Sequence, residues 1–207
     1  TSVGTELTIG FTVTGIAARI ITKGGAQTGD VIILTKPLGT GTILAAEMSG
    51  TRPEFPMLGE AVAGAFASMV QPLDRAAQIL APLAHAMTDV TGFGLAGHML
   101  EILRASNCAA TLHLPDIPLL PGAASLAAKD VASTLAPANR AACLGQIHAP
   151  TTPEAALLFD PQTGGGLLAC VARTDAPALL TALTATGTRA AIIGEITSGL
   201  PHLRVSH

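Results

Sequence analysis

The stretch MTDVTGFGLAGHMLEIL, residues 87–103, places one carboxylate, that of Asp89, between an apolar run and a glycine-rich turn that precedes a predicted helix. A carboxylate at the end of a strand is well placed to hold Mg²⁺ over bound phosphates. An aspartate here can equally cap the helix, because its side chain accepts hydrogen bonds from backbone N–H groups. The spacing by itself favours the cap over the metal ligand, and it leaves both interpretations of Asp89 open.

Three glycine-rich turns have the composition of anion-binding loops. They are TKPLGTG (35–41), TDVTGFG (88–94) and DPQTGGG (160–166), and each lies at a boundary of a predicted strand. Glycine lets backbone N–H groups approach an anion, and a helix N-terminus adds a partial positive charge. None of the three matches GxxxxGK[ST] or GxGxxG, and loops also need glycine for conformational reasons. Taken singly, each turn predicts phosphate binding only weakly. Asp160 has the same two interpretations as Asp89, and Pro161, which follows it, favours a role in the turn over that of a metal ligand.

Other common catalytic patterns do not occur in the sequence. The histidines form no HExxH pair, and there is no GxSxG elbow. His98 lies in the helix predicted after the TDVTGFG turn, where a packing or surface role is favoured over a contact with that turn. The three cysteines are widely spaced and form no CxxC, which argues against a zinc site or redox pair and for a reduced, cytoplasmic setting. Cys108 and Cys170 are predicted to be unreactive core residues.

The composition argues against two classes of partner. The chain has 207 residues, of which 49% are hydrophobic and 12% are charged, and its formal net charge is −3. The negative charge and the lack of Trp and Tyr argue against nucleic-acid binding. No apolar stretch of about 18 residues is free of charges and helix breakers, so no membrane-spanning helix is predicted.

The hydrophobic pattern predicts alternating strands and helices. Alternating or continuous apolar runs predict strands at 6–15, 31–36, 85–90, 109–114, 165–172, 190–196 and 202–206. Helical spacing predicts helices at 42–48, 57–70, 75–83, 92–106 and 174–186, with further helical pieces in 123–147. Alternation from about residue 30 onward indicates an α/β (α+β) fold in which helices cover a sheet. The strand at 6–15 fits this pattern less well.

Taken together and in this order, the three turns resemble the C-terminal half of the selenophosphate synthetase (selenide, water dikinase) family, within the aminoimidazole ribonucleotide synthetase-like superfamily. IGFTVTG (9–15), STLAPANRA (133–141) and IGEI (193–196) support the resemblance, which covers nearly the whole chain. The string TDVTGFGLxGH is its most specific part. One departure is Gly164, where the family usually has Ser.

The resemblance implies a fold and a division into domains. Residues 1–15 would be the last strand of a truncated N-terminal ATP-binding domain, and residues 16–207 a C-terminal α/β domain with a mixed sheet covered by helices. The intact enzyme of the family is a homodimer. It converts selenide, ATP and water to selenophosphate, AMP and phosphate with the help of Mg²⁺.

The resemblance also implies roles for particular residues. Asp89 would bind Mg²⁺, and the family's catalytic nucleophile has no counterpart in this chain, so the fragment alone is expected to be inactive. The predicted nucleotide- or phosphate-binding residues are Thr1, Thr40, Gly41, Gly164, Gly165 and Gly166.

Two other functions remain open. The chain could be a binding module that holds a phosphorylated ligand at the glycine-rich turns without chemistry. It could also belong to another ATP-dependent synthetase or kinase of the same superfamily, which TKPLGTG and DPQTGGG disfavour.

Overall fold

The computed structural model describes residues 10–12, 14–17, 19–50 and 57–207. Within these residues, seven strands form one sheet in the order β2-β5-β1-β6-β3-β7-β4. The strands are Val31–Leu34 (β1), Ala84–Asp89 (β2), Ala109–His113 (β3), Ile147–His148 (β4), Leu167–Val171 (β5), Ala191–Thr197 (β6) and Leu203–Ser206 (β7). β7 pairs parallel with β3 and β4, and the other neighbouring strands pair antiparallel. The predicted mixed sheet is confirmed.

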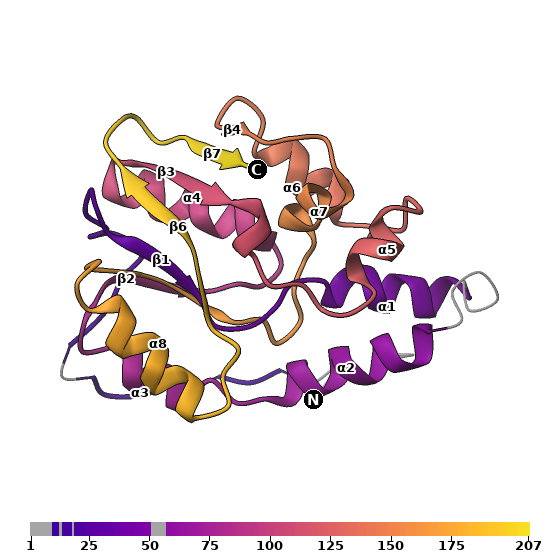
Figure 1. The fold of residues 1–207 in the computed structure, drawn as a ribbon, viewed down its shortest axis with the longest axis horizontal. Helices are drawn as coiled ribbons and strands as arrows, with labels where there is room; N and C mark the ends of the chain where they lie inside the picture. Colours follow the sequence, from indigo (N-terminus) through magenta and orange to yellow (C-terminus); the bar gives the residue numbers. More distant parts are fainter. Residues whose placement is uncertain (1–9, 13, 18, 51–56) are drawn as a thin grey trace.

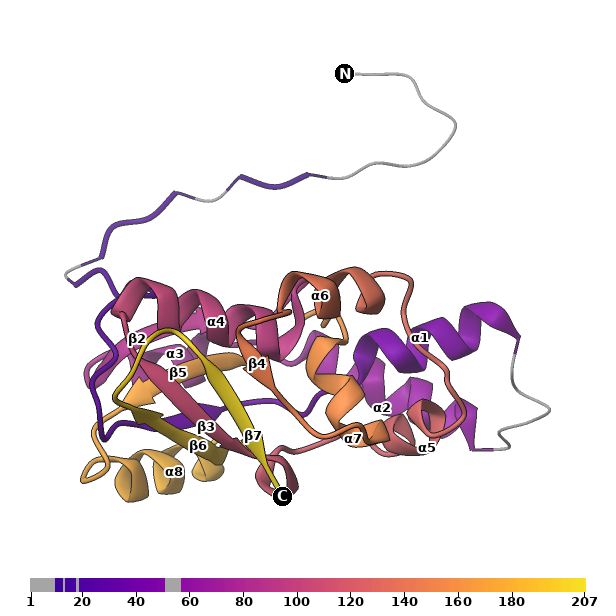
Figure 2. The same ribbon diagram turned by 90° about the horizontal axis from the view of Figure 1, so that it is seen from above.

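Helices cover both faces of this sheet. Figure 2 shows α4 (Gly94–Ser106) on one face and α8 (Ala176–Ala185) on the other, and α3 (Asp74–Leu80) packs beside α8. The central strands β1 and β5 are buried along their whole length, which explains why both are continuous apolar runs rather than alternating ones. The α/β fold class predicted from the sequence is therefore confirmed.

A third group of helices lies beyond the ends of the strands. α1 (Thr40–Ser49), α2 (Leu58–Val70) and α5 (Ala123–Ala127) share a separate apolar cluster, which Figure 1 shows at the right of the sheet. α6 (Ala136–Ala142) packs against α4. This group borders the edge of the sheet at which the glycine-rich turns lie.

Most predicted elements agree with the structure to within a few residues. The structure adds α7 (Pro153–Ala156), two 3₁₀ turns at Leu114–Asp116 and Leu157–Phe159, and the two-residue strand β4. β4 has no local signal, because its only strand character comes from parallel pairing with β7. α7 did carry a signal, since Thr152 is its N-cap and its hydroxyl accepts a hydrogen bond from Ala155 N.

The strand predicted at 6–15 is wrong for the residues that can be compared. Residues 10–12, 14 and 15 are in no strand, and the side chain of Phe11 is 89% exposed. Figure 2 shows this part of the chain leading away from the sheet. Alternation alone does not make a strand, because a strand needs a neighbour to pair with. The rest of the predicted strand lies outside the described residues, and the domain boundary at residue 15 stays a prediction.

Cys108 and Cys170 are free and buried, as predicted for core residues, and Cys143 is free and buried as well. Burial raises the pKa of the Cys108, Cys143 and Cys170 thiols. Of the helices in the described residues, none has the length and apolar character needed to cross a membrane.

Candidate functional site

The order β2-β5-β1 brings together three turns that are far apart in the sequence. β5 runs antiparallel to both neighbours, so its first residue, Leu167, pairs with Asp89 at the end of β2. The turns that follow β2 and β1 therefore meet the turn that precedes β5. Thr35 N donates to Leu167 O at 3.0 Å, and Val90 N donates to Gly166 O at 2.8 Å. Sheet register, rather than sequence proximity, builds this site.

The side chain of Gln162 connects the 160–166 turn to the start of helix α1. Its Oε1 accepts hydrogen bonds from Gly39 N at 3.0 Å, Thr40 N at 3.2 Å and Thr40 Oγ1 at 3.1 Å. Thr163 N in turn donates to Thr40 Oγ1 at 3.0 Å. Amides at a helix start have no partner within the helix, and Gln162 supplies one.

Asp160 completes this cap of α1. Its Oδ2 accepts from Gly41 N at 3.1 Å and from Gln162 Nε2 at 2.9 Å, and its Oδ1 accepts from Thr42 Oγ1 at 2.9 Å. The carboxyl group is buried, and burial raises its pKa more than these hydrogen bonds lower it. Asp160 therefore stabilises the start of a helix that lies about 120 residues earlier in the chain.

We expect Asp160 to give stability a distinctive pH dependence. Because the folded-state pKa is raised, the folded protein binds this proton more readily than the unfolded chain, and the group's contribution to stability falls as pH rises from the ordinary carboxyl pKa through the raised one. Urea unfolding of wild type and Asp160→Asn at several pH values measures the difference in unfolding free energy. That difference should decrease with rising pH and then level off. A difference that grows with pH would mean that the folded-state pKa is depressed.

Lys36 fastens the same turn to the C-terminal end of α2. Its ammonium donates to three carbonyl oxygens, those of Ser68 at 2.8 Å, Gln71 at 2.7 Å and Gly164 at 2.8 Å. The residue is only 3% exposed, and burial lowers the pKa of its amine. The cation also lies where the end of a helix carries partial negative charge, which favours the contact.

Lys36→Met should destabilise the fold by about 3 kcal/mol, because it removes a buried ammonium that donates part-buried hydrogen bonds to three carbonyl oxygens. Urea unfolding measures the loss. Lys23→Met is the matched control: Lys23 is half-exposed and its ammonium pairs with one carboxylate, so about 0.5 kcal/mol is expected. Equal losses in the two variants would contradict a special role for Lys36.

The glycines of the turns are explained by close backbone packing. A Cβ on Gly41 would lie 2.5 Å from the nearest backbone oxygen of the 160–166 turn, and one on Gly166 would lie 2.5 Å from Lys36 N. A Cβ on Gly165 would overlap Val90 O. No side chain fits at these three glycine positions, which is a sufficient reason for glycine whether or not a phosphate binds.

Gly164 has a different reason to be glycine. Its φ of +58° is in the left-handed region, and a Cβ would lie 2.7 Å from Met69 O. A serine in this place would meet both obstacles with this backbone. The departure from the family's usual Ser therefore fits the local structure of this chain.

Asp89 lies at the edge of the sheet beside these turns. Its side chain is exposed, and among the described residues its carboxylate makes no hydrogen bond or ion pair. The alternative role as a helix cap is not what the structure has, because α4 receives no side-chain hydrogen bond at its N-cap. The carboxylate is therefore available to a ligand, and its role as a Mg²⁺ ligand stays a prediction.

A cavity of about 640 Å³ opens beside the meeting point of the turns. Gly41, Gly92 and Thr163, one residue from each of the three turns, form one wall of the cavity. The exposed side of α1 forms another wall. Residues 132–135, which include the start of STLAPANRA, close the remaining side. Asn139 of the same motif donates to Gly92 O at 2.8 Å. The three turns and this fourth motif of the resemblance thus surround one cavity.

The structure thus brings together most of the predicted site residues. Thr40, Gly41, Gly164, Gly165 and Gly166 gather at one edge of the sheet, and Thr1 lies outside the described residues. The amides of Thr40 and Gly41 already donate to side chains, so a phosphate would compete for them, and the ligand roles of these residues stay predictions.

Three residues were missed in the sequence analysis, and the surroundings of a fourth were predicted only in part. Lys36, Gln162 and Asn139 each lie within a recognised motif, but their contacts depend on distant parts of the chain. His98 was expected to pack or face solvent. It is indeed buried, but its Nε2 lies 3.3 Å from Thr91 Oγ1, so it also contacts the turn.

Comparisons with known proteins show the family to which the chain is similar. Residues 27–205 match the family model of the AIR synthase related protein, C-terminal domain. Selenide, water dikinase of Myxococcus xanthus (strain DK1622) is 38% identical over 97% of this chain and 58% of its own length. The enzyme of that name from Pelobacter propionicus is 38% identical over 92% of this chain and 56% of its own. The chain thus spans little more than half the length of these relatives.

Solved structures of low sequence identity share the fold. E. coli HypE, a hydrogenase maturation protein, matches 92% of this chain and 50% of its own with a TM-score of 0.65 and 21% identity. Thiamine-monophosphate kinase from Stenotrophomonas maltophilia K279a matches 90% of this chain and 52% of its own, with a TM-score of 0.63 and 18% identity. From its family match and its mixed, helix-covered sheet, the chain belongs to the family of C-terminal domains of AIR synthase related proteins.

Proposed function

We propose that this chain is the C-terminal part of an ATP-dependent selenophosphate synthetase, which converts selenide, ATP and water to selenophosphate, AMP and phosphate. The similarity to two enzymes named selenide, water dikinase supports this reaction. The observation that carries the proposal is the exposed, unpaired carboxylate of Asp89, which lies within TDVTGFGLAGH at the edge where the three turns of the described structure meet.

The residues present fit one part of a magnesium site. Proteins often give Mg²⁺ one or two carboxylates while substrate phosphates and water complete its coordination. No group of three His, Cys, Asp or Glu side chains that could hold a metal occurs in the described part of the chain. Asp89 would therefore be one ligand among several. Mg²⁺, when bound, neutralises charge on the phosphates.

The other residues of the site would bind and orient. Thr1, Thr40, Gly41, Gly164, Gly165 and Gly166 would approach the nucleotide or its phosphates, while Lys36, Asp160 and Gln162 hold the turns that carry most of them. No residue of this chain is proposed as the catalytic nucleophile, so this chain by itself should be inactive. The intact enzyme is proposed to be a cytoplasmic homodimer.

An assay of the intact protein and of this chain by itself tests the proposal. AMP release should require selenide and appear only with the intact protein, and ³¹P NMR should detect selenophosphate. ATP binding without AMP release would favour the binding module instead. Phosphate transfer to another acceptor would favour a different synthetase or kinase. Turnover by this chain alone would contradict the assignment of the nucleophile to another part of the intact enzyme.

A further inference from the structure

His98 is the one buried histidine in the described residues, and both of its ring nitrogens have partners. Nδ1 lies 3.1 Å from Glu101 Oε2, one turn later in α4, and Nε2 lies 3.3 Å from Thr91 Oγ1 in the 88–94 turn. A carboxylate beside Nδ1 favours the proton on that nitrogen, which leaves Nε2 of a neutral ring to accept from the Thr91 hydroxyl. The Phe93 ring, with its centroid 5.5 Å from that of His98, packs against the imidazole.

Glu101 connects this histidine to a distant part of the chain. The Glu101 oxygen that faces His98 also accepts from Lys23 Nζ at 2.7 Å. Burial acts to raise the pKa of Glu101, but Lys23 and His98 together hold that pKa below its ordinary value. The carboxylate is therefore kept charged, which fixes the imidazole in one orientation.

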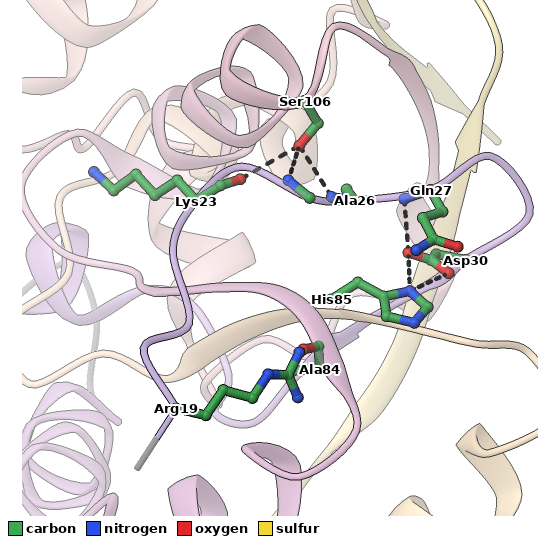
Figure 3. A network of polar contacts seen from close by, with 9 residues as sticks. Arg19, Lys23, Ala26, Gln27, Asp30, Ala84, His85 and Ser106 are labelled. Atoms are coloured by element: carbon green, nitrogen blue, oxygen red, sulfur yellow. Dashed lines mark hydrogen bonds and ion pairs between the residues drawn. The ribbon is translucent and has the colours of Figure 1, made fainter. Parts of the chain in front are cut away.

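Lys23 is itself held in place, as Figure 3 shows. Ser106, the last residue of α4, accepts hydrogen bonds from Gly25 N and Ala26 N, both at 3.1 Å, and donates to Lys23 O at 3.4 Å. Arg19 of the same segment donates to Ala84 O at 2.7 Å. The segment is thus fastened to α4 and to β2, and the side chain of Lys23 can reach Glu101.

Thr91 is the point at which this chain of contacts meets the candidate site. It lies two residues after Asp89, and its carbonyl accepts from Gln162 N at 3.0 Å and Gly94 N at 3.1 Å. Its hydroxyl faces His98 while its backbone contacts the 160–166 turn. A change in the orientation of Thr91 would therefore move the backbone that carries Asp89.

We propose that His98 is a positioning residue for the 88–94 turn: with Glu101 and Lys23 it fixes Thr91 and, through it, the place of the Asp89 carboxylate. The inference rests on the proposed role of Asp89 as a Mg²⁺ ligand. Residues that orient a metal ligand typically change metal affinity or activity by about 10- to 100-fold when they are replaced.

The test measures the Mg²⁺ concentration that gives half-maximal ATP turnover by the intact protein. Thr91→Val, which has the same shape without the hydroxyl, should raise this concentration about tenfold, and His98→Leu should do so at least equally. Thr91→Ser keeps the hydroxyl, and His98→Gln keeps a polar group near the place of Nε2. The Mg²⁺ concentration for half-maximal turnover should therefore stay close to the wild-type value in both of these variants. Hydrogen exchange at residues 90–93 should accelerate in Thr91→Val and His98→Leu.

His85 supplies the matched control. Its Nδ1 lies 2.9 Å from both carboxylate oxygens of Asp30, so it is also a histidine paired with an acid, but at the far end of β2 (Figure 3). His85→Gln should leave the Mg²⁺ midpoint unchanged even if it lowers the melting temperature.

The outcomes separate this inference from the function on which it rests. If Asp89→Asn abolishes turnover while Thr91→Val and His98→Leu leave the Mg²⁺ midpoint unchanged, the positioning role is refuted and the proposed function stands. The positioning role is likewise refuted if these variants lower only the melting temperature. Because Thr91→Val changes no buried charge, it keeps the test decisive even if His98→Leu does not fold. If Asp89→Asn has no effect, both ideas fail.

Discussion

Asp89→Asn should lower the Mg²⁺-dependent ATP turnover of the intact protein by about a hundredfold or more, because a metal-bound phosphate site draws several kcal/mol from charge neutralisation. The substitution keeps the size of the side chain and removes its charge. Since the carboxylate is exposed and has no partner in the described residues, the fold should not change. Turnover at saturating ATP over a range of Mg²⁺ concentrations, with melting curves of both proteins, measures the effect.

Asp116→Asn is the matched control for this prediction. Asp116 is also an exposed aspartate near the end of a strand, but it follows β3, whereas Asp89 is the last residue of β2. It should leave turnover and its Mg²⁺ dependence unchanged. Near-normal activity of Asp89→Asn would make Asp89 a surface residue of the turn and would remove the main support for the proposed function.

Gly165→Ala should destabilise the fold by about 3 kcal/mol or more, because the added methyl group would overlap Val90 O and approach Gln162 Cβ to 2.9 Å. Neither neighbour can move easily, since Val90 N is bonded to Gly166 O and Gln162 caps α1. Urea unfolding of the 207-residue chain measures the loss of unfolding free energy. The substitution should also weaken the capping of α1 by Gln162.

Gly64→Ala is the control with the opposite expected sign. Gly64 lies within α2, and a Cβ there would meet no atom within 4 Å. Alanine is about 1 kcal/mol more favourable than glycine inside a helix, so this variant should be slightly more stable than wild type. If Gly165→Ala were equally well tolerated, the explanation of the turn glycines by close packing would be wrong.

The sequence predicted most of the fold because its local patterns agree with the tertiary structure. The buried runs that became β1 and β5, and the amphipathic helix α4, have the periodicity that their burial requires. The failures are places where the local pattern and the tertiary pairing disagree. β4 has no local signal and depends on pairing with β7. Residues 10–12, 14 and 15 belong to an alternating pattern, but they are in no strand.

The residues of the candidate site could likewise be predicted in part from the sequence. The three turns and Asp89 could be identified from residue types and their order, because glycine and aspartate have distinctive backbone and charge properties. Their meeting could not be identified, since it follows from the position of β5 between β2 and β1. The local pattern that favoured a turn role for Asp160 could not reveal that the Asp160 carboxylate caps α1.

The sequence by itself determined which residues could do chemistry, the alternation of strands and helices, and the resemblance that led to a reaction. Only the tertiary structure decided that the start of α1 is already capped by Gln162, that Lys36 joins three carbonyls, and that His98 faces Thr91. Local patterns are encoded over a few neighbouring residues, whereas the contacts of Gln162 and Lys36 join residues that come together only when the sheet and its helices assemble. The separation is 122 residues for Gln162 and Thr40 and 128 residues for Lys36 and Gly164. Thr91 and His98 are only 7 residues apart, and their contact depends on how α4 begins after the turn.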